Sequence, residues 1–319
     1  MKILLFILLA FTLNAASIKP QYHLETSKMV TDLFIEGKTL YAATGGGIVD
    51  IFDISTQKRI GEIVLPSVKD FLGDLIPPKI YSIDKLGDTI VLVSQGKSGF
   101  RDVYIKKDDT LTRIIDSTKE FFLKEGLFID EDHIILGLLS SEFILYQLST
   151  NKVIYRHAIK ERNSGGSALG DMSLSEDKKT LVTADESGEI NFFNVADFKH
   201  LKVSKGQNLD NIYKIDYKQG IVITAGQDRR CAIYKDDGSA YYLKAEFLIY
   251  AAGLSPSGKI GVFASTIDNG LQIFNTNTKS KIAFLEGHNA TLTDFAFISE
   301  SEFFSSADEN RILFWDINK

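Results

Sequence analysis

The sequence has one cysteine, one tryptophan and five prolines in 319 residues, and the scarcity of cysteine limits its chemistry most. A single cysteine, Cys231, excludes an internal disulfide, a Cys-x-x-Cys redox pair and a haem-attachment motif. We therefore expect Cys231 to be a small buried hydrophobic residue rather than a reactive thiol. The chain also lacks a basic stripe, and its formal net charge is −6. Since phosphate binding needs clustered Lys and Arg, this charge argues against a nucleic-acid partner.

Long apolar runs are missing except at the N-terminus, which reads "MKILLFILLAFTLNAAS". Lys2 precedes a short apolar segment, and the small residues of 14–16 follow it, as in a cleaved signal peptide. The apolar segment has about 11 residues, whereas a membrane-spanning helix needs roughly 20. We predict a signal peptide over residues 1–16 and an exported, periplasmic protein over 17–319, without membrane insertion after cleavage. An uncleaved anchor or a buried helix is the alternative.

The rest of the chain carries a repeat with a period near 41 residues. In each copy a short apolar strand leads through a turn of small or acidic residues to an alternating strand that ends in an aromatic residue. These closing aromatics are Phe52, Tyr104, Tyr146, Phe193, Tyr234, Phe274 and Trp315, at spacings of 52, 42, 47, 41, 40 and 41 residues. Each copy has room for one further strand on either side. Four short antiparallel strands repeated seven times predict an all-β fold, a seven-bladed β-propeller.

The best-kept repeats resemble the WD40 family. The segment "EGHNATLTDFAFISESEFFSSADENRILFWD" has the Gly-His and Trp-Asp pairs of that family at blade spacing, in Gly287, His288, Trp315 and Asp316. Two other segments, "MSLSEDKKTLVTADESGEINFF" and "LSPSGKIGVFASTIDNGLQIFN", resemble its middle hairpin. In the other repeats Phe or Tyr replaces the tryptophan, so the resemblance implies a degenerate WD40-like propeller.

The resemblance also implies a structural role for His288, Glu309, Trp315 and Asp316. WD40 blades often contain a hydrogen-bonded network of a histidine, a hydroxyl residue, an acid and the tryptophan. Counting back from Trp315 places Glu309 at the acid position and Ala307 at the hydroxyl position. We therefore expect this network to be incomplete, and the other blades to depend on aromatic packing.

Trp315 ends the third strand of the last blade, and only four residues follow it. We expect the fourth strand to come from residues 17–27, in which Ile18, Tyr22 and Leu24 supply apolar positions. This pairing would close the ring and cover its sheet edges.

No segment predicts catalysis or a cofactor. The five histidines fall in different repeats without metal-ligand spacing: His23, His133, His157, His200 and His288. The acidic segments 106–109 and 130–133 lie where hairpin turns belong, and the Gly-rich segment 44–50 has no helix after it, so a tight turn explains it better than a phosphate site. We expect no catalytic residue, no metal site and no cofactor.

Two features suggest a partner-binding surface. An insertion over residues 66–81 contains Phe71, Leu72, Leu75 and Ile76, too many apolar residues for a solvated loop. They either pack over the rim of the propeller or dock a partner. The second feature is the turn with Arg229 and Arg230, since arginine is favoured at interface centres.

These patterns together favour a monomeric, non-enzymatic scaffold that binds another protein. The combination resembles the propeller-type L accessory proteins of periplasmic nitrate reductase systems, which implies a respiratory reductase or its maturation factors as partner. The alternative is a periplasmic hydrolase or lactonase with its site at the central channel. A cluster of carboxylates or histidines at the channel mouth would favour the enzyme, and small or apolar lining would oppose it.

Overall fold

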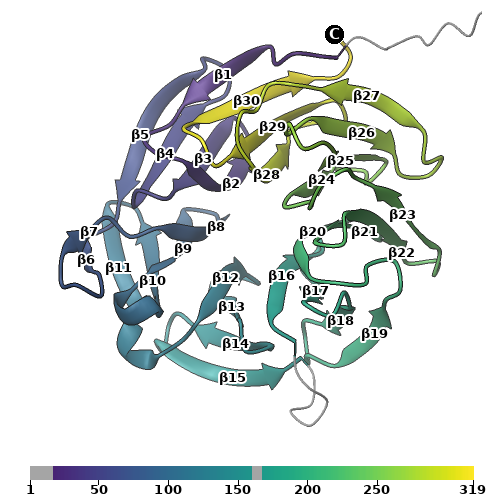
Figure 1. The fold of residues 1–319 in the computed structure, drawn as a ribbon. Coiled ribbons are helices and arrows are strands. Elements are labelled where there is room, and N and C mark those ends of the chain that lie inside the picture. Colours follow the sequence, from purple (N-terminus) through teal and green to yellow (C-terminus); the bar gives the residue numbers. More distant parts are fainter. Residues whose placement is uncertain (1–16, 160–166) are drawn as a thin grey trace, which may run out of the picture.

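The computed structural model describes residues 17–159 and 167–319, so the predicted signal peptide lies outside the described residues, as do residues 160–166. Seven four-stranded antiparallel sheets surround a central channel in a ring (Figure 1). The predicted seven-bladed β-propeller is therefore confirmed. Within the described part of the chain, no helix is long and apolar enough to cross a membrane.

Each blade is a meander whose first strand lies at the channel and whose last strand lies at the outer edge (Figure 1). Blade 1 consists of β2 (Val30–Glu36), β3 (Thr39–Thr44), β4 (Ile48–Asp53) and β5 (Lys58–Val64). Blade 2 consists of β8 (Ile80–Leu86), β9 (Thr89–Gln95), β10 (Arg101–Lys107) and β11 (Thr110–Ile115). Blade 3 consists of β12 (Leu123–Phe128), β13 (His133–Leu138), β14 (Glu142–Gln147) and β15 (Lys152–Ala158). Blades 4 and 5 consist of β16 (Leu169–Leu174), β17 (Thr180–Asp185), β18 (Ile190–Asn194) and β19 (His200–Ser204); and β20 (Ile212–Lys218), β21 (Ile221–Gly226), β22 (Arg230–Lys235) and β23 (Ala240–Lys244). Blades 6 and 7 consist of β24 (Ala252–Leu254), β25 (Ile260–Ala264), β26 (Leu271–Asn275) and β27 (Lys281–Leu285); and β28 (Leu292–Phe297), β29 (Glu302–Ala307), β30 (Arg311–Asp316) and β1 (Tyr22–Glu25).

Strand β1 closes the ring, as predicted. It pairs antiparallel with β30, with Tyr22 opposite Phe314 and Glu25 opposite Arg311. Just before β1, Ile18 forms a parallel bridge with Leu285 at the end of β27. The N-terminal segment therefore completes blade 7 and also ties it to blade 6, which removes the open edge of β30.

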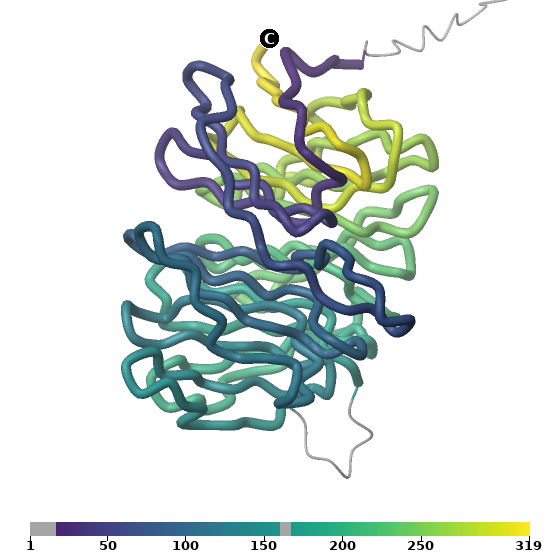
Figure 2. The backbone as a smooth tube through the Cα atoms, turned by 90° about the vertical axis from the view of Figure 1, so that its left-hand side faces the viewer, coloured from purple at the N-terminus to yellow at the C-terminus, as the bar shows by residue number. Residues whose placement is uncertain are grey.

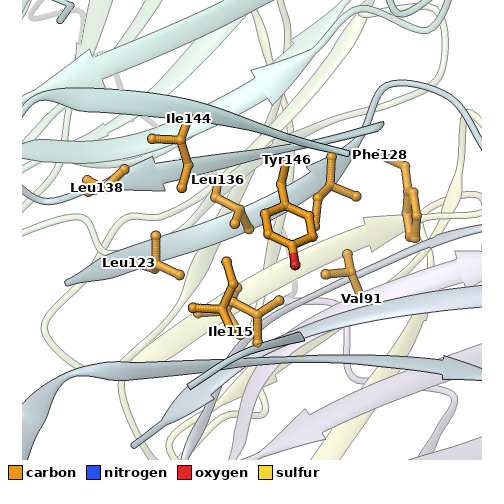
Figure 3. Packing of buried hydrophobic residues seen from close by; sticks show 11 residues of the cluster. Val91, Ile115, Leu123, Phe128, Leu136, Leu138, Ile144 and Tyr146 are labelled. Carbon is orange, nitrogen blue, oxygen red and sulfur yellow. The ribbon is translucent and has the colours of Figure 1, made fainter. Parts of the chain in front are cut away.

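The core consists of apolar clusters between neighbouring blades. Figure 3 shows the cluster between blades 2 and 3, where Val91 and Ile115 of blade 2 face Leu123, Phe128 and Tyr146 of blade 3. All seven closing aromatic residues of the repeats are buried, with at most 3% of each residue exposed. The repeat therefore marks the residues that fill the layer between blades. Cys231 is fully buried in a similar cluster, as expected for a packing residue.

The strand directions define two faces of the ring. We call the end that carries the links between blades and the turns between the second and third strands the connection face. The opposite end carries the remaining turns, and we call it the turn face. Three further elements lie on the connection face: the hairpin β6 (Val68–Lys69) and β7 (Leu75–Ile76), and the 3-10 helices η1 (Lys97–Gly99) and η2 (Ser117–Lys119). The hairpin projects from the ring between blades 1 and 2 (Figures 1 and 2).

Candidate functional site

Polar residues recur at one position of the inner strands. In six of the seven inner strands the pairing register shifts at the start of the strand, directly before this position. In chain order the position is occupied by Asp32, Ser82, Glu125, Asp171, Lys214, Gly253 and Asp294. A β-bulge re-aims the side chain that follows it, so the irregularity directs these polar groups toward the neighbouring blade and the channel.

Several of these side chains lock one blade to the next. Oδ2 of Asp294 accepts a hydrogen bond from the Leu33 N–H at 3.0 Å, which joins blade 7 to blade 1. Asp32 accepts from Ile83 N–H at 2.9 Å, and Asp171 accepts from Ile215 N–H at 2.8 Å. Two further bonds of this kind are donated by Gly126 N–H to Ser82 and by Met172 N–H to Glu125. Buried acceptors of this type hold the inner strands in register around the channel.

Lys214 stands where blade 5 would supply a carboxylate, and it reaches across the channel. Its Nζ lies 3.1 Å from Asp294 Oδ1 and 3.3 Å from Asp32 Oδ1, so one cation joins blades 5, 7 and 1. Burial alone lowers the pKa of Lys214. The charges of its carboxylate neighbours outweigh burial and raise this pKa well above the usual value; the neighbours are Asp294, Asp32, Asp171 and Glu125. Lys214 therefore remains charged.

One lysine does not neutralise four carboxyl groups. Burial raises the pKa of Asp294 to about 7, although Lys214 opposes the shift. Burial and the charge of Asp171 raise the pKa of Glu125 well above its ordinary value, and burial also raises the pKa of Asp171. Protonation of Asp294 below about pH 7 therefore reduces the negative charge of the inner ring, in addition to the positive charge of Lys214.

Above this cluster the channel opens on the connection face as a cavity of about 490 Å³. Lys79 and Lys124 line this cavity together with Asp32, Glu125 and Asp171. Two tyrosines, Tyr213 and Tyr250, stack at 4.9 Å on one side, and Tyr81 lies under the guanidinium of Arg101. The channel mouth is therefore charged and aromatic rather than small and apolar. Within the described residues, no group of three or more His, Cys, Asp or Glu is arranged to hold a metal ion.

The tryptophan network of the last blade is complete, so the expected gap at Ala307 was wrong. Trp315 Nε1 donates to Ser305 Oγ at 2.7 Å, and this oxygen lies 2.6 Å from Nε2 of His288. His288 Nδ1 lies 2.7 Å from Oε1 of Glu309. Burial lowers the pKa of His288, although Glu309 opposes the shift. A neutral ring that donates from Nδ1 and accepts at Nε2 satisfies all of these contacts.

The error arose because the hydroxyl position was placed eight residues before Trp315, at Ala307, instead of ten residues before it, at Ser305. Ser305 lies ten residues before Trp315, and Thr224 lies ten residues before the closing aromatic Tyr234. Thr224 Oγ1 donates to Asn208 at 2.8 Å, and Asn208 Nδ2 donates to Asp228 at 3.3 Å, so blade 5 has a related network without histidine or tryptophan. The recurring spacing of a hydroxyl and an aromatic residue could have revealed both networks from the sequence.

Asp316 belongs to the ring closure and not to the tryptophan network. Its backbone N–H donates to Gln21 Oε1 at 2.6 Å, and its carboxylate accepts from the Asn318 N–H at 3.0 Å. It therefore helps to hold the segment before β1 against the last blade.

The two candidate arginines differ in availability. Arg229 is exposed at the turn between β21 and β22, with a positive φ of 65°. Arg230 is engaged within the protein: Nη1 donates to the Gln207 carbonyl at 2.8 Å, and the guanidinium stacks 4.3 Å above the Tyr242 ring. Of the two arginines, Arg229 is therefore the more accessible to a partner.

The insertion over 66–81 does not pack over the rim of the propeller. Phe71 is 90% exposed, Leu72 is 73% exposed and Leu75 is 70% exposed, whereas Ile76 is half-buried. Of the two alternatives that the sequence left open, rim packing is therefore excluded for the first three residues.

Exposed apolar residues are unevenly distributed between the two faces. Apart from those on the outer strands, the exposed large apolar residues all lie on the connection face: Met29, Phe71, Leu72, Leu75, Phe122, Leu209, Phe247 and Ile267. Within the described residues, the turns of the opposite face expose none. The acidic segments 106–109 and 130–133 both belong to that turn face. Asp130 accepts a hydrogen bond from the His133 N–H of its own turn, and Asp132 accepts one from the Ser149 N–H of the adjacent turn between β14 and β15.

Comparison with known proteins assigns no family to the chain. No protein-family profile matches the chain. The chain is 24% identical over 223 residues to the CCR4-associated factor 4 homolog of Candida glabrata, an alignment that covers 68% of this chain. It covers 33% of the relative, so the chain spans about a third of that protein's length.

Proposed function

We propose that the protein is a non-enzymatic interaction platform that binds a protein partner through its connection face. The unequal distribution of exposed apolar residues carries this proposal. A face that serves only as a solvated surface gains nothing from eight exposed large apolar side chains, whereas such side chains provide the energy of protein recognition.

The inner ring supports the same function. The hydrogen bonds between inner strands and the bridging Lys214 hold the blades in fixed positions. Loops on such a rigid ring lose little conformational entropy when they bind, which favours affinity. The acidic cluster accordingly acts first as a structural element of the platform.

The proposal is tested by affinity capture with residues 17–319 from an extract of the native host. We expect a specific protein to be captured by the wild type and lost in the double variant Leu209→Asp and Phe247→Asp on the connection face. The variant Asp237→Lys on the turn face is the control and should retain it. Equal retention by all three proteins would contradict the choice of face.

A finer proposal concerns the compartment and the partner. We propose that the chain is exported to the periplasm and assists a respiratory reductase, such as a nitrate reductase, or its maturation factors. This rests on the signal-peptide pattern of residues 1–16 and on the resemblance to propeller-type accessory proteins. The similar Candida glabrata protein is named as an associated factor, which agrees with a platform role but not with this particular partner. N-terminal sequencing of the secreted protein and the identity of the captured partner test the two points separately.

One observation favours the alternative, a hydrolase or lactonase with its site at the central channel. The channel mouth carries charged side chains, which such a site requires. Glu125 has a raised pKa and lies in the wall of the cavity, as a general acid would. Against this, Glu125 and its neighbours already accept backbone hydrogen bonds from the next blade. Hydrolysis of simple lactones and esters by the purified protein, abolished in Glu125→Gln, would favour the enzyme. Equal rates in both proteins would exclude this site.

A further inference from the structure

The β6–β7 hairpin has the form of an anchor that enters a pocket on another molecule. Its tip, residues 70–74, is a tight turn fixed by its own hydrogen bonds. Asp70 Oδ1 accepts from the Leu72 N–H at 2.8 Å and from the Asp74 N–H at 2.9 Å, and the Asp70 N–H donates to the Asp74 carbonyl at 2.9 Å. Gly73 has a φ of +93°, which the turn requires and other residues rarely adopt.

This fixed turn presents apolar groups to solvent rather than to the ring. Phe71 is 90% exposed and Leu72 is 73% exposed, and Leu75 continues the apolar surface onto β7. The base of the hairpin is held by Pro78, which is buried and packs against Gly47. The turn therefore keeps its shape without a partner, and little conformational entropy remains to be lost on binding.

Charge identifies the kind of partner. The tip carries two carboxylates, Asp70 and Asp74, against one exposed lysine, Lys69 at the end of β6, in a protein of net charge −6. An anionic lipid surface would repel it, whereas Lys and Arg at the rim of a protein pocket would complement it. We propose that Phe71 and Leu72 insert into an apolar pocket of a protein partner whose rim is basic. This proposal rests on the platform function and names the part of the connection face that anchors the partner.

Photocross-linking gives the first test. The full chain carries p-benzoylphenylalanine at position 71 or, as a matched position, at 209, because Leu209 on the same face is 66% exposed. We expect position 71 to cross-link to a partner segment that lines an apolar pocket with Lys or Arg at its edge. Cross-links from 209 alone would overturn the hairpin as anchor but keep the platform. Cross-links from neither position would contradict both proposals.

Affinity gives the second test, with the cross-linked partner in purified form. Phe71→Ala should raise the Kd at least about 10-fold, as expected for an anchoring residue, whereas Leu209→Ala should change the Kd less than about 3-fold. Asp74→Lys should weaken binding more at low salt than at high salt, because rim charges are screened. An unchanged Kd for Phe71→Ala, or tighter binding for Asp74→Lys, would overturn the proposal. So would Phe71-dependent binding of the protein to vesicles of phosphatidylcholine and phosphatidylglycerol, since that result would assign the tip to a membrane.

Discussion

Ser305 is the residue on which the last blade depends most, because one hydroxyl serves two buried partners. Ser305→Ala removes the acceptor of the Trp315 N–H and the partner of His288 Nε2. Trp315 and His288 are both buried, and among the described residues neither nitrogen has another hydrogen-bond partner. Leaving a buried polar group unpaired costs about 1–3 kcal/mol, so the substitution should cost about 2–6 kcal/mol. For a chain of this size that corresponds to a fall in Tm of about 3–9 °C.

The matched control is Ser94→Ala in blade 2. Ser94 lies ten residues before Tyr104, the position equivalent to Ser305, but its Oγ is buried without a hydrogen-bond partner. Removal of an unpaired buried hydroxyl should be neutral or stabilising. Thermal unfolding followed by circular dichroism compares the two variants, and the fluorescence of Trp315, the only tryptophan, reports on blade 7. Equal losses in both variants, or no loss in Ser305→Ala, would refute the reasoning.

Three further predictions concern closure, pH and the thiol. Deletion of residues 17–26 removes β1 and the bridge from Ile18, so the Tm should fall markedly. Leu24→Ala alone should lower the free energy of unfolding by about 2–5 kcal/mol, because Leu24 is buried. An unchanged melting curve for the deletion variant would contradict the closure. The pKa of Asp294 is raised from 3.8 to about 7, so the folded state holds a proton that the unfolded state releases, and this contribution to stability is lost as the pH rises from about 4 to about 7. Asp294→Asn keeps an oxygen acceptor for the Leu33 N–H, so its Tm relative to wild type should rise over that pH range, and parallel curves would exclude the assignment. Burial raises the pKa of Cys231 well above its usual value, so a thiol reagent such as DTNB should react only at the rate of unfolding; rapid reaction with the native protein would show that the thiol is accessible.

The sequence predicted the architecture well because the repeat records the packing between blades. Each closing aromatic residue fills the same layer, so one period locates seven blades, and Tyr22 and Leu24 show the alternation of a strand that completes the last sheet. The spacing of Ser305 and Trp315 was also present in the sequence, but its meaning depended on aligning the turns correctly.

The channel cluster could not be predicted in the same way. Its residues lie one per blade, about 40 to 50 positions apart, and Asp32, Asp171 and Lys214 each stand in ordinary strand patterns. Only the ring brings Lys214 within 3.1 Å of Asp294 and 3.3 Å of Asp32. The hairpin was ambiguous for a different reason, since an apolar insertion has the same composition whether it packs against the ring or projects from it.

The central claim is that the connection face binds a protein, and hydrogen–deuterium exchange on the isolated complex tests it most directly. We predict slower exchange in the complex for the links 66–78, 205–211 and 245–251, with unchanged exchange in the opposite turns 37–38, 87–88 and 236–239. Protection confined to the turn face would contradict the account.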